Sequence, residues 1–390
     1  MKSRQFDVLV AGGGIIGLTA ALAMAQRNYN VALIDAGDLQ IKQLIEPDLR
    51  VYAINYASKQ LFEQLDVWNL IDKECISPYQ HMYVWDASTS AYIEFDARLI
   101  ASSNLGAIIE ETVIKNALLK RLALEPTVTL FPNSKITQIT QQPQIKLYSN
   151  EESWEGRLLL ITDGGNSPIR NMLSVPVTTW PYHQHALVAT VQTEIPHRQT
   201  AYQVFNPNGP LAFLPLVDEH TCSIVWSTTS QQANQLMTLP SEVFNQALSK
   251  AFAYRLGHVN LISNRHQFPL IMRHTKQYVG RNWLLMGDAA HTIHPLAGLG
   301  LNVGLADIAT WLQCLEGSNR EFSKIRLSSY QRQRKYAVWQ IIAVMGGLKT
   351  LFANPLPPIM TLRKLGLNLC NQFTPLKRLF IEQAIGQSLN

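Results

Sequence analysis

Three glycines near the start of the chain have the spacing of a phosphate-binding turn. Gly12, Gly14 and Gly17 form a G-x-G-x-x-G motif between a short apolar run, residues 6–11, and an alanine-rich helical pattern over residues 18–27. The first glycine permits a tight turn, the second lets a pyrophosphate approach the backbone, and the third lets the helix pack on the strand. Because the helix N-terminus faces the phosphates, the motif predicts dinucleotide binding.

An acidic residue stands where such a motif needs one. Residues 31–34 form a second apolar run that ends in Asp35, 18 residues after Gly17. Its carboxylate can accept hydrogen bonds from the hydroxyls of an adenosine ribose. Strand, turn, helix, strand and acid make a βαβ unit of about thirty residues, the size that the motif requires. A glycine-rich turn without a ligand is the alternative, and it leaves the placement of the acid to chance.

Two later segments combine an apolar strand pattern with a polar turn. Residues 158–162 lead into Asp163 and Gly164, and residues 283–286 lead into Gly287 and Asp288. Parallel strands bind their ligand at the carboxyl edge of the sheet, where an aspartate can hold a polyol hydroxyl. Glycines after the second turn open a helix whose amides can face an anionic or electron-poor group. A second purely structural turn is the alternative.

The same region invites a metal hypothesis. Asp288, His291 and His294 are oxygen and nitrogen ligands spaced by three residues. Pro295 and Gly298 predict a loop at this place, and no further cluster of ligands is visible in the sequence. We therefore expect no metal site.

Composition and charge narrow the class of protein. The 390 residues are 47% hydrophobic and 16% charged, which excludes a disordered chain, and the length suggests two or three domains at roughly 100–200 residues each. No apolar stretch reaches the ~20 residues of a spanning helix, and no signal-peptide core precedes the first strand. The four cysteines form no CxxC pair, which favours reduced thiols. We expect a cytoplasmic protein, soluble or peripheral to the membrane.

The pattern along the chain changes between residues 180 and 270. Residues 186–191, 211–214 and 222–226 read as strands separated by turn residues, with few long helices before residues 241–256. This pattern predicts an antiparallel sheet inserted into the nucleotide-binding domain, and residues 81–95 are expected in the same sheet. After residue 300 the pattern is helical, with breaks at residues 354–358 and 374–375.

Together the motifs carry a resemblance. The G-x-G-x-x-G turn, an early Arg50, the central Asp163-Gly164 and the late Gly287-Asp288 resemble, in order and spacing, the flavoprotein aromatic hydroxylases of the para-hydroxybenzoate hydroxylase fold. Among these, the chain resembles the ubiquinone-biosynthesis hydroxylases from end to end, and most closely the 2-polyprenylphenol hydroxylases, which add the ring C5 oxygen. The segments that carry this resemblance are residues 49–55, 82–86, 185–190, 211–216, 222–227 and 287–298.

The resemblance implies an α/β fold in three parts. A Rossmann-like FAD-binding domain is expected from residues 1–75, 100–180 and 270–350. A mostly antiparallel β-sheet domain that binds the substrate is expected from residues 76–99 and 181–269. Residues 351–390 are expected to form a basic C-terminal helical segment.

The resemblance also implies a place for each motif residue against FAD. The glycine turn with Ile15 and Asp35 would hold the ADP half, and Arg50 would lie along the phosphates and the ribityl chain. Asp288 would bind the ribityl hydroxyls, and Asp163 belongs to a motif associated with both FAD and the nicotinamide donor. The residues expected to line the isoalloxazine ring are Pro295, Gly298, Leu299, Gly300, Leu301 and Asn302.

The chain departs from the family pattern at three of these places. Thr162 precedes the central Asp-Gly, where the family usually has alanine, and Leu299 replaces the glutamine of a Gly-Gln-Gly loop. Asp35 replaces a frequent glutamate and reaches less far. Because the contacts of the flavin loop are largely made by backbone, we expect FAD binding to survive Leu299.

The implied reaction is a hydroxylation. NAD(P)H would reduce FAD, and reaction with O2 would give a flavin C4a-hydroperoxide that transfers oxygen to the ring of a polyprenylphenol, at C5. The protein would supply position and dryness. No side-chain base is assigned; His294 is a candidate contact for the phenol hydroxyl, and a structural histidine is the favoured interpretation. The alternatives are a flavin reductase or dehydrogenase of related fold, and a non-catalytic flavin-binding subunit of the ubiquinone-biosynthesis assembly.

The positive charge is concentrated at the C-terminal end. The formal net charge is +5, yet residues 320–390 hold 11 Lys/Arg and 2 Asp/Glu, so this segment carries +9 and the rest of the chain −4. The overall balance does not indicate nucleic acid. Basic amphipathic helices in the segment are suited to contact with anionic lipid or with partner proteins of the same pathway. A solvated helical cap on the flavin domain is the favoured interpretation, because charged helix faces are usually solvated.

Overall fold

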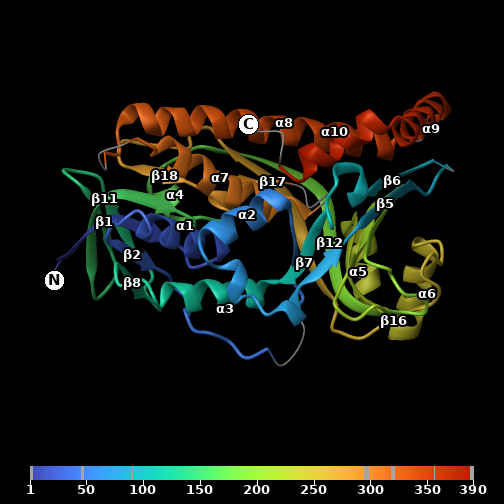
Figure 1. The fold of residues 1–390 in the computed structure, drawn as a ribbon, viewed down its shortest axis with the longest axis horizontal. Helices are drawn as coiled ribbons and strands as arrows, with labels where there is room; N and C mark the ends of the chain where they lie inside the picture. Colours follow the sequence, from blue (N-terminus) through green and yellow to red (C-terminus); the bar gives the residue numbers. More distant parts are fainter. Residues whose placement is uncertain are drawn as a thin grey trace.

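The first of three sheets is mixed: most of its strands run parallel, and the last two strands at one edge run antiparallel (Figure 1). The computed structural model describes residues 3–44, 48–89, 91–293, 298–317, 321–354 and 356–386. The order of this sheet is β8-β2-β1-β11-β10-β9, with β18 beside the second half of β11. Its strands are β1 (Ser3–Ala11), β2 (Val31–Ile34), β8 (Val128–Phe131), β9 (Gln138–Thr140), β10 (Ile145–Tyr148), β11 (Ser153–Ile161) and β18 (Trp283–Leu285).

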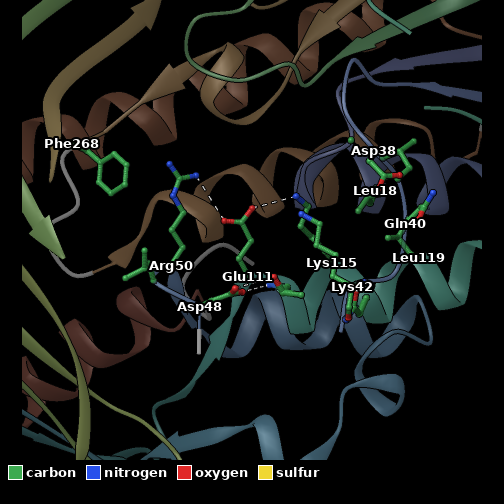
Figure 2. A pocket seen from close by; sticks show the side chains of 15 residues that line it. Leu18, Asp38, Gln40, Lys42, Asp48, Arg50, Glu111, Lys115, Leu119 and Phe268 are labelled. Carbon is green, nitrogen blue, oxygen red and sulfur yellow. Dashed lines mark hydrogen bonds and ion pairs between the residues drawn. The ribbon is translucent and has the colours of Figure 1, made fainter. Parts of the chain in front are cut away.

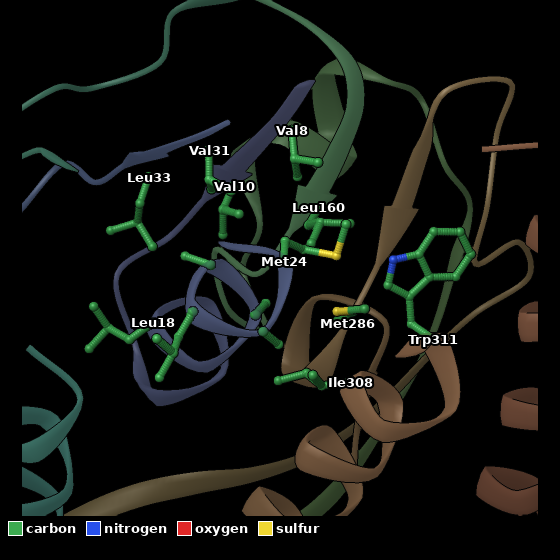
Figure 3. Close-up of a cluster of buried hydrophobic side chains, with 14 of the residues drawn as sticks. Val8, Val10, Leu18, Met24, Val31, Leu33, Leu160, Met286, Ile308 and Trp311 are labelled. Carbon is green, nitrogen blue, oxygen red and sulfur yellow. The ribbon is translucent and has the colours of Figure 1, made fainter. Parts of the chain in front are cut away.

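Helices cover this sheet and complete the main core. Every residue of α1 (Ile15–Ala25) except Ile16 is buried, because the helix lies against the sheet and also contacts α3 (Glu111–Leu122) and α7 (Gly300–Cys314). Figure 3 shows how side chains of α1, α7 and the strands meet in this core. A helix apolar on all sides is the expected result of burial on all sides, and it explains the alanine-rich pattern.

The second sheet has nine strands, in the order β19-β17-β12-β15-β14-β13-β5-β6 with β16 beside β12. All neighbours are antiparallel except β13 and β5. The mostly antiparallel sheet and the place of residues 81–95 in it are thereby confirmed. The strands are β5 (His81–Asp86), β6 (Tyr92–Asp96), β12 (Val177–Thr193), β13 (Thr200–Asn206), β14 (Gly209–Pro215), β15 (Thr221–Thr229), β16 (Val259–Leu261), β17 (His266–Thr275) and β19 (His291–Thr292).

Two helices pack on one face of the second sheet, where the sequence predicted one. The expected helix over residues 241–256 is α6 (Ser241–Ala251), which ends early because Ala253 and Tyr254 adopt positive φ. A further helix, α5 (Ser230–Thr238), precedes it. The sequence did not reveal α5 because only Ala233 and Leu236 of this polar segment are buried.

A small antiparallel sheet and the C-terminal helices complete the fold. The small sheet has the order β3-β7-β4. The breaks expected near residues 354–358 and 374–375 separate the last three helices, which pass along one side of the molecule in Figure 1. The elements are β3 (Val51–Ile54), β4 (Ser77–Tyr79), β7 (Gly106–Glu110), α2 (Tyr56–Gln64), α4 (Pro168–Met172), α8 (Lys324–Ala353), α9 (Pro357–Gln372) and α10 (Thr374–Ala384).

The fold class predicted from the sequence, α/β with an inserted sheet and C-terminal helices, is confirmed. The proposed boundaries at residues 180 and 270 fall inside β12 and β17, which pair with each other, and the boundary at residue 350 falls inside α8. The division of the chain into domains therefore stays a prediction. Within the part of the chain that the structure describes, no helix is long and apolar enough to cross a membrane.

Candidate cofactor-binding site

Four predicted motifs meet at one edge of the first sheet. Ala11 at the end of β1 lies opposite Ile34 of β2 and Ile161 of β11, and Ile161 lies opposite Leu285 of β18. Because these strands are parallel, the residues that follow them leave the sheet at the same edge. The motif residues that the structure brings together there are Gly12, Asp35, Asp163 and Asp288.

Two glycines of the turn lie so close to neighbouring backbone that a side chain would not fit, and the third faces open space. Gly12 has a φ of +110°, and a Cβ on it would lie 2.5 Å from the carbonyl oxygen of Thr162. A Cβ on Gly17 would lie 1.7 Å from the Gly12 carbonyl oxygen. Among the described residues, no atom comes within 4 Å of a Cβ on Gly14. The backbone is thus exposed where a phosphate would approach, at the N-terminus of α1 beside the buried Ile15.

Asp35 fixes the conformation of this turn. Its Oδ2 accepts a hydrogen bond of 2.5 Å from the Gly13 N–H, and its Oδ1 accepts one of 2.7 Å from the Gly37 N–H. The half-buried carboxylate therefore stands beside the opening of the turn, as a ribose partner must. The side chain of Asp35 is shorter than that of the glutamate frequent in the family, and it contacts the glycine backbone directly.

A pocket of about 350 Å³ extends from the glycine turn to Arg50 (Figure 2). Glu111 on α3 lies between two cations, 3.8 Å from the Arg50 guanidinium and 3.4 Å from the Lys115 ammonium. The Arg50 guanidinium also lies 5.2 Å from the ring centre of Phe268 on β17. The pocket is lined by Gly13, Leu18, Asp38, Leu39, Gln40, Lys42, Asp48, Leu49, Arg50, Glu111, Thr112, Lys115, Asn116, Leu119 and Phe268.

Two polar anchors hold the outer wall of the pocket against α3. Asp48 accepts hydrogen bonds from the Thr112 N–H at 2.5 Å and from the Thr112 hydroxyl at 3.0 Å. The Asn116 side chain accepts from the Lys42 N–H at 2.9 Å and donates to the Lys42 carbonyl at 2.8 Å. Sequence reasoning missed these residues because their partners lie 64 and 74 positions away and form no local motif.

Asp163 and Asp288 occupy neighbouring turns that one arginine ties together. Arg170, buried on α4, donates to the Gly165 carbonyl at 2.9 Å and to the Ala289 carbonyl at 3.0 Å. Asp163 accepts a hydrogen bond from the Ile169 N–H at 3.1 Å, and desolvation raises its pKa. Solvent reaches Asp288 at the edge of the sheet, but protein atoms crowd around its carboxylate. The resulting desolvation raises the pKa of Asp288, although His291 and Arg50 act in the opposite sense.

The first turn of α7 is joined to β3 by an amide side chain. Asn302 is buried, accepts a hydrogen bond from the Asn55 N–H at 3.1 Å and donates to the Ala53 carbonyl at 2.7 Å. Gly298 has a φ of +62°, which favours glycine, and no described atom lies within 4 Å of a Cβ on Gly300. His294 and Pro295 lie outside the described residues.

These residues fit FAD. Open glycine backbone lies at two places, the glycine turn and the start of α7, and both belong to helix N-termini that suit anionic or electron-poor groups. The site also contains a cation, Arg50, whose side chain is 59% exposed, and the carboxylates expected for the ribose and ribityl hydroxyls. The assignment of single residues to parts of FAD stays a prediction.

The comparisons agree with this geometry. The family model of the FAD binding domain matches residues 5–344. The 3-demethoxyubiquinol 3-hydroxylase of Escherichia coli is 33% identical over 99% of this chain and 100% of its own length, and the mitochondrial ubiquinone biosynthesis monooxygenase COQ6 of Drosophila melanogaster is 33% identical over 99% and 91%. The chain belongs to the FAD-dependent hydroxylases of ubiquinone biosynthesis. The p-nitrophenol 4-monooxygenase of Pseudomonas putida shares the fold, with a TM-score of 0.79 at 15% identity over 98% of both chains.

As a member of this family, the protein is an FAD-dependent monooxygenase, and its departures from the family pattern have structural partners. The Thr162 hydroxyl donates to the Ala11 carbonyl at 2.8 Å and thereby joins the ends of β11 and β1. The Leu299 side chain packs with Val303 and with Val338 and Ile341 of α8 in a small apolar cluster. Leu299 is only partly buried, and the contacts that it makes with this cluster are apolar.

The hydroxylase also contains a buried charge cluster beneath the Gly287-Asp288 turn, which sequence reasoning missed. Asp307 on α7 is fully buried and accepts hydrogen bonds from the Gly287 N–H at 2.8 Å, from His291 Nε2 at 2.8 Å and from Arg334 Nε at 2.5 Å. Burial alone would raise the pKa of Asp307, but His291 and Arg334 outweigh it and lower the pKa. In the described ranges, no three His, Cys, Asp or Glu side chains gather as metal ligands.

Proposed function

We propose that this enzyme hydroxylates the aromatic ring of a polyprenylphenol intermediate of ubiquinone biosynthesis, at ring C5, with NAD(P)H and O2 as co-substrates. The names of the relatives support a quinone precursor as the substrate, since one acts on 3-demethoxyubiquinol. FAD, when bound, supplies the reduction and oxygen activation that amino-acid side chains cannot supply.

One observation carries the proposal beyond the family: apolar side chains follow one side of α8 from the cluster of Leu299 to the second sheet. Near the loop, Val338 of α8 belongs to the cluster of Leu299. Further along, Leu348 and Phe352 pack in a cluster with Phe205 of β13. The Phe352 and Phe205 rings stack with centroids 3.9 Å apart. A substrate with a phenol head at the flavin and a long apolar tail matches this arrangement.

The residues of the chain bind and position the cofactor and exclude water. The glycine turn and Arg50 bind the phosphates of the cofactor, and Asn302 holds the flavin loop against β3. The apolar surface of α8 beside Leu299 excludes water from the reacting groups. Dryness matters because water at such a site diverts reduced flavin and O2 to hydrogen peroxide.

The purified holoenzyme tests the proposal. It is mixed with NADH or NADPH, O2 and a 2-polyprenylphenol, and consumed O2 is compared with hydroxylated product by mass spectrometry. We expect equal amounts of both. NAD(P)H oxidation without product would favour a flavin reductase. FAD-loaded protein that neither oxidises NAD(P)H nor hydroxylates the phenol would favour a non-catalytic flavin-binding subunit.

The ring position needs a second measurement. Deletion of the gene in its host should cause a quinone precursor that lacks only the C5 oxygen to accumulate. A precursor that lacks another ring oxygen would contradict C5 and retain the enzyme class, and an unchanged quinone pool would contradict the pathway.

A further inference from the structure

Glu111 lies in the lining of the cofactor pocket between two cations that also attract phosphates (Figure 2). Its Oε2 is 3.8 Å from the Arg50 guanidinium, and its Oε1 is 3.4 Å from the Lys115 ammonium. Both distances exceed the roughly 2.7–2.9 Å of a tight charge-assisted hydrogen bond. The two ion pairs are therefore loose, and either cation can exchange Glu111 for another anion.

The fold keeps the Glu111 carboxylate in this place. Glu111 belongs to the first turn of α3, where the helix dipole favours an acidic side chain. The Tyr52 hydroxyl, next to Arg50 on β3, donates a hydrogen bond of 3.4 Å to Glu111 Oε2. Burial and the neighbouring Glu111 raise the pKa of Tyr52, so its hydroxyl remains a donor. The Glu111 side chain is 23% exposed and that of Arg50 is 59% exposed, so the arginine has more room to turn.

The charges in the lining of this pocket cancel. Asp48 is occupied by the N–H and the hydroxyl of Thr112, whereas Glu111 is directed at the cations. A carboxylate beside Arg50 and Lys115 repels a phosphate that approaches the same two cations. The acids of the lining are Asp38, Asp48 and Glu111, and the bases are Lys42, Arg50 and Lys115.

We propose that Glu111 competes with the phosphates of FAD for Arg50 and Lys115 and thereby weakens the binding of FAD. The inference rests on the predicted placement of Arg50 along these phosphates, and it adds Lys115 as a second phosphate-binding cation. Competition of this kind lowers the affinity for FAD and speeds its release. A role of Glu111 as acceptor for a hydroxyl of FAD fits less well, because both of its oxygens already face cations.

Flavin fluorescence after dilution of the purified holoenzyme tests this proposal, since it gives the affinity and the release rate of FAD. Glu111→Gln removes the charge and keeps the shape. We expect it to bind FAD about fivefold more tightly, the upper end of what a partly exposed charge contributes. The matched control is Glu63→Gln, which removes a carboxylate from a Lys–Glu pair of the same spacing on α2, outside the pocket lining. It should bind FAD like the wild type.

Two further measurements isolate the charge. Lys115→Met should bind FAD about fivefold more weakly, and Glu111→Gln/Lys115→Met should return close to the wild-type affinity because the charges of the lining cancel again. Raised NaCl concentration should weaken FAD binding more in Glu111→Gln than in the wild type, since the lining of this variant carries an excess positive charge.

Weaker FAD binding by Glu111→Gln would overturn the proposal in favour of a hydroxyl acceptor. Unchanged FAD binding with a lower unfolding temperature would overturn it in favour of a purely structural acid at the start of α3. Wild-type affinity of Arg50→Met would overturn the placement of Arg50 and the proposal with it. The fluorescence measurement needs no phenol, so failure of the proposed hydroxylation would be seen separately and would leave the role of Glu111 intact.

Discussion

At the scale of single residues, two glycines of the first turn are needed for different reasons, although the G-x-G-x-x-G motif does not distinguish them. A Cβ at position 17 meets backbone at 1.7 Å, whereas a Cβ at position 14 meets no described atom within 4 Å. Gly17 thus serves packing, and Gly14 keeps open the space that a phosphate would fill.

The two alanine variants should therefore fail in different ways. We expect Gly14→Ala to unfold at the wild-type temperature but to bind FAD at least about tenfold more weakly, because its methyl group occupies the phosphate approach. Gly17→Ala should lose roughly 1–3 kcal/mol or more of stability from overpacking. Thermal unfolding and flavin fluorescence titration measure the two effects. Equal FAD affinity of Gly14→Ala and wild type would show that the turn does not bind the pyrophosphate.

At the scale of elements, buried charges join pieces that lie far apart in the sequence. Asp307 links α7, α8 and the turn before Asp288 through His291 and Arg334. Its lowered pKa means that the cluster stabilises the fold above the unfolded value of about 3.9. This contribution is lost as the pH falls through the lower folded pKa.

Replacement of the carboxylate tests this linkage. Asp307→Asn leaves Arg334 buried without its anion, so we expect a loss of about 3–5 kcal/mol near pH 7. As the pH falls below about 4, the free energy of unfolding of the variant should also decrease less than that of the wild type. Urea unfolding between pH 3 and pH 7 measures both. Parallel pH profiles of variant and wild type would contradict the assigned linkage.

A buried ion pair between α9 and β5 is a second linkage between elements, with Arg363 Nε 2.7 Å from Asp86 Oδ2. Arg363→Met leaves the Asp86 carboxylate buried and unpaired, and we expect faster amide hydrogen exchange throughout α9. Asp86→Asn/Arg363→Met removes both charges and should restore most of the protection, because neutral isosteres avoid the desolvation cost. Unchanged exchange in the single variant would show that the apolar cluster alone holds the helix.

How far the sequence predicts the site depends on how local the signal is. The glycine turn, Asp35 and Asp288 directly follow strands, so a short motif and the parallel register sufficed to place them at one edge. Arg170 and Asn302 act on partners 119 and about 250 positions away, which no local pattern reveals. The polar α5 was missed for a related reason, since packing against the second sheet and not periodicity determines it.

At the scale of the whole molecule, α8 connects the two large sheets. In its first third Tyr330 packs in the main core, further along Val338 packs in the cluster of Leu299, and near its end Phe352 packs against the second sheet. Thirty residues of helix span about 45 Å, long enough to align a phenol head and its tail. We therefore expect substitutions on α8 to change the recognition of the substrate tail.

A polar side chain on the inner side of α8 should discriminate between substrates with and without a tail. We expect Leu348→Gln, in the cluster of Phe205, to lower kcat/KM for a long-tailed polyprenylphenol about tenfold, because the amide is desolvated against the tail. Turnover of a phenol without a tail should not change. The control is Val344→Gln, which is 56% exposed one turn earlier on the same helix and should affect neither substrate. If both substrates lose activity equally, Leu348 supports the fold and the tail does not pass along α8.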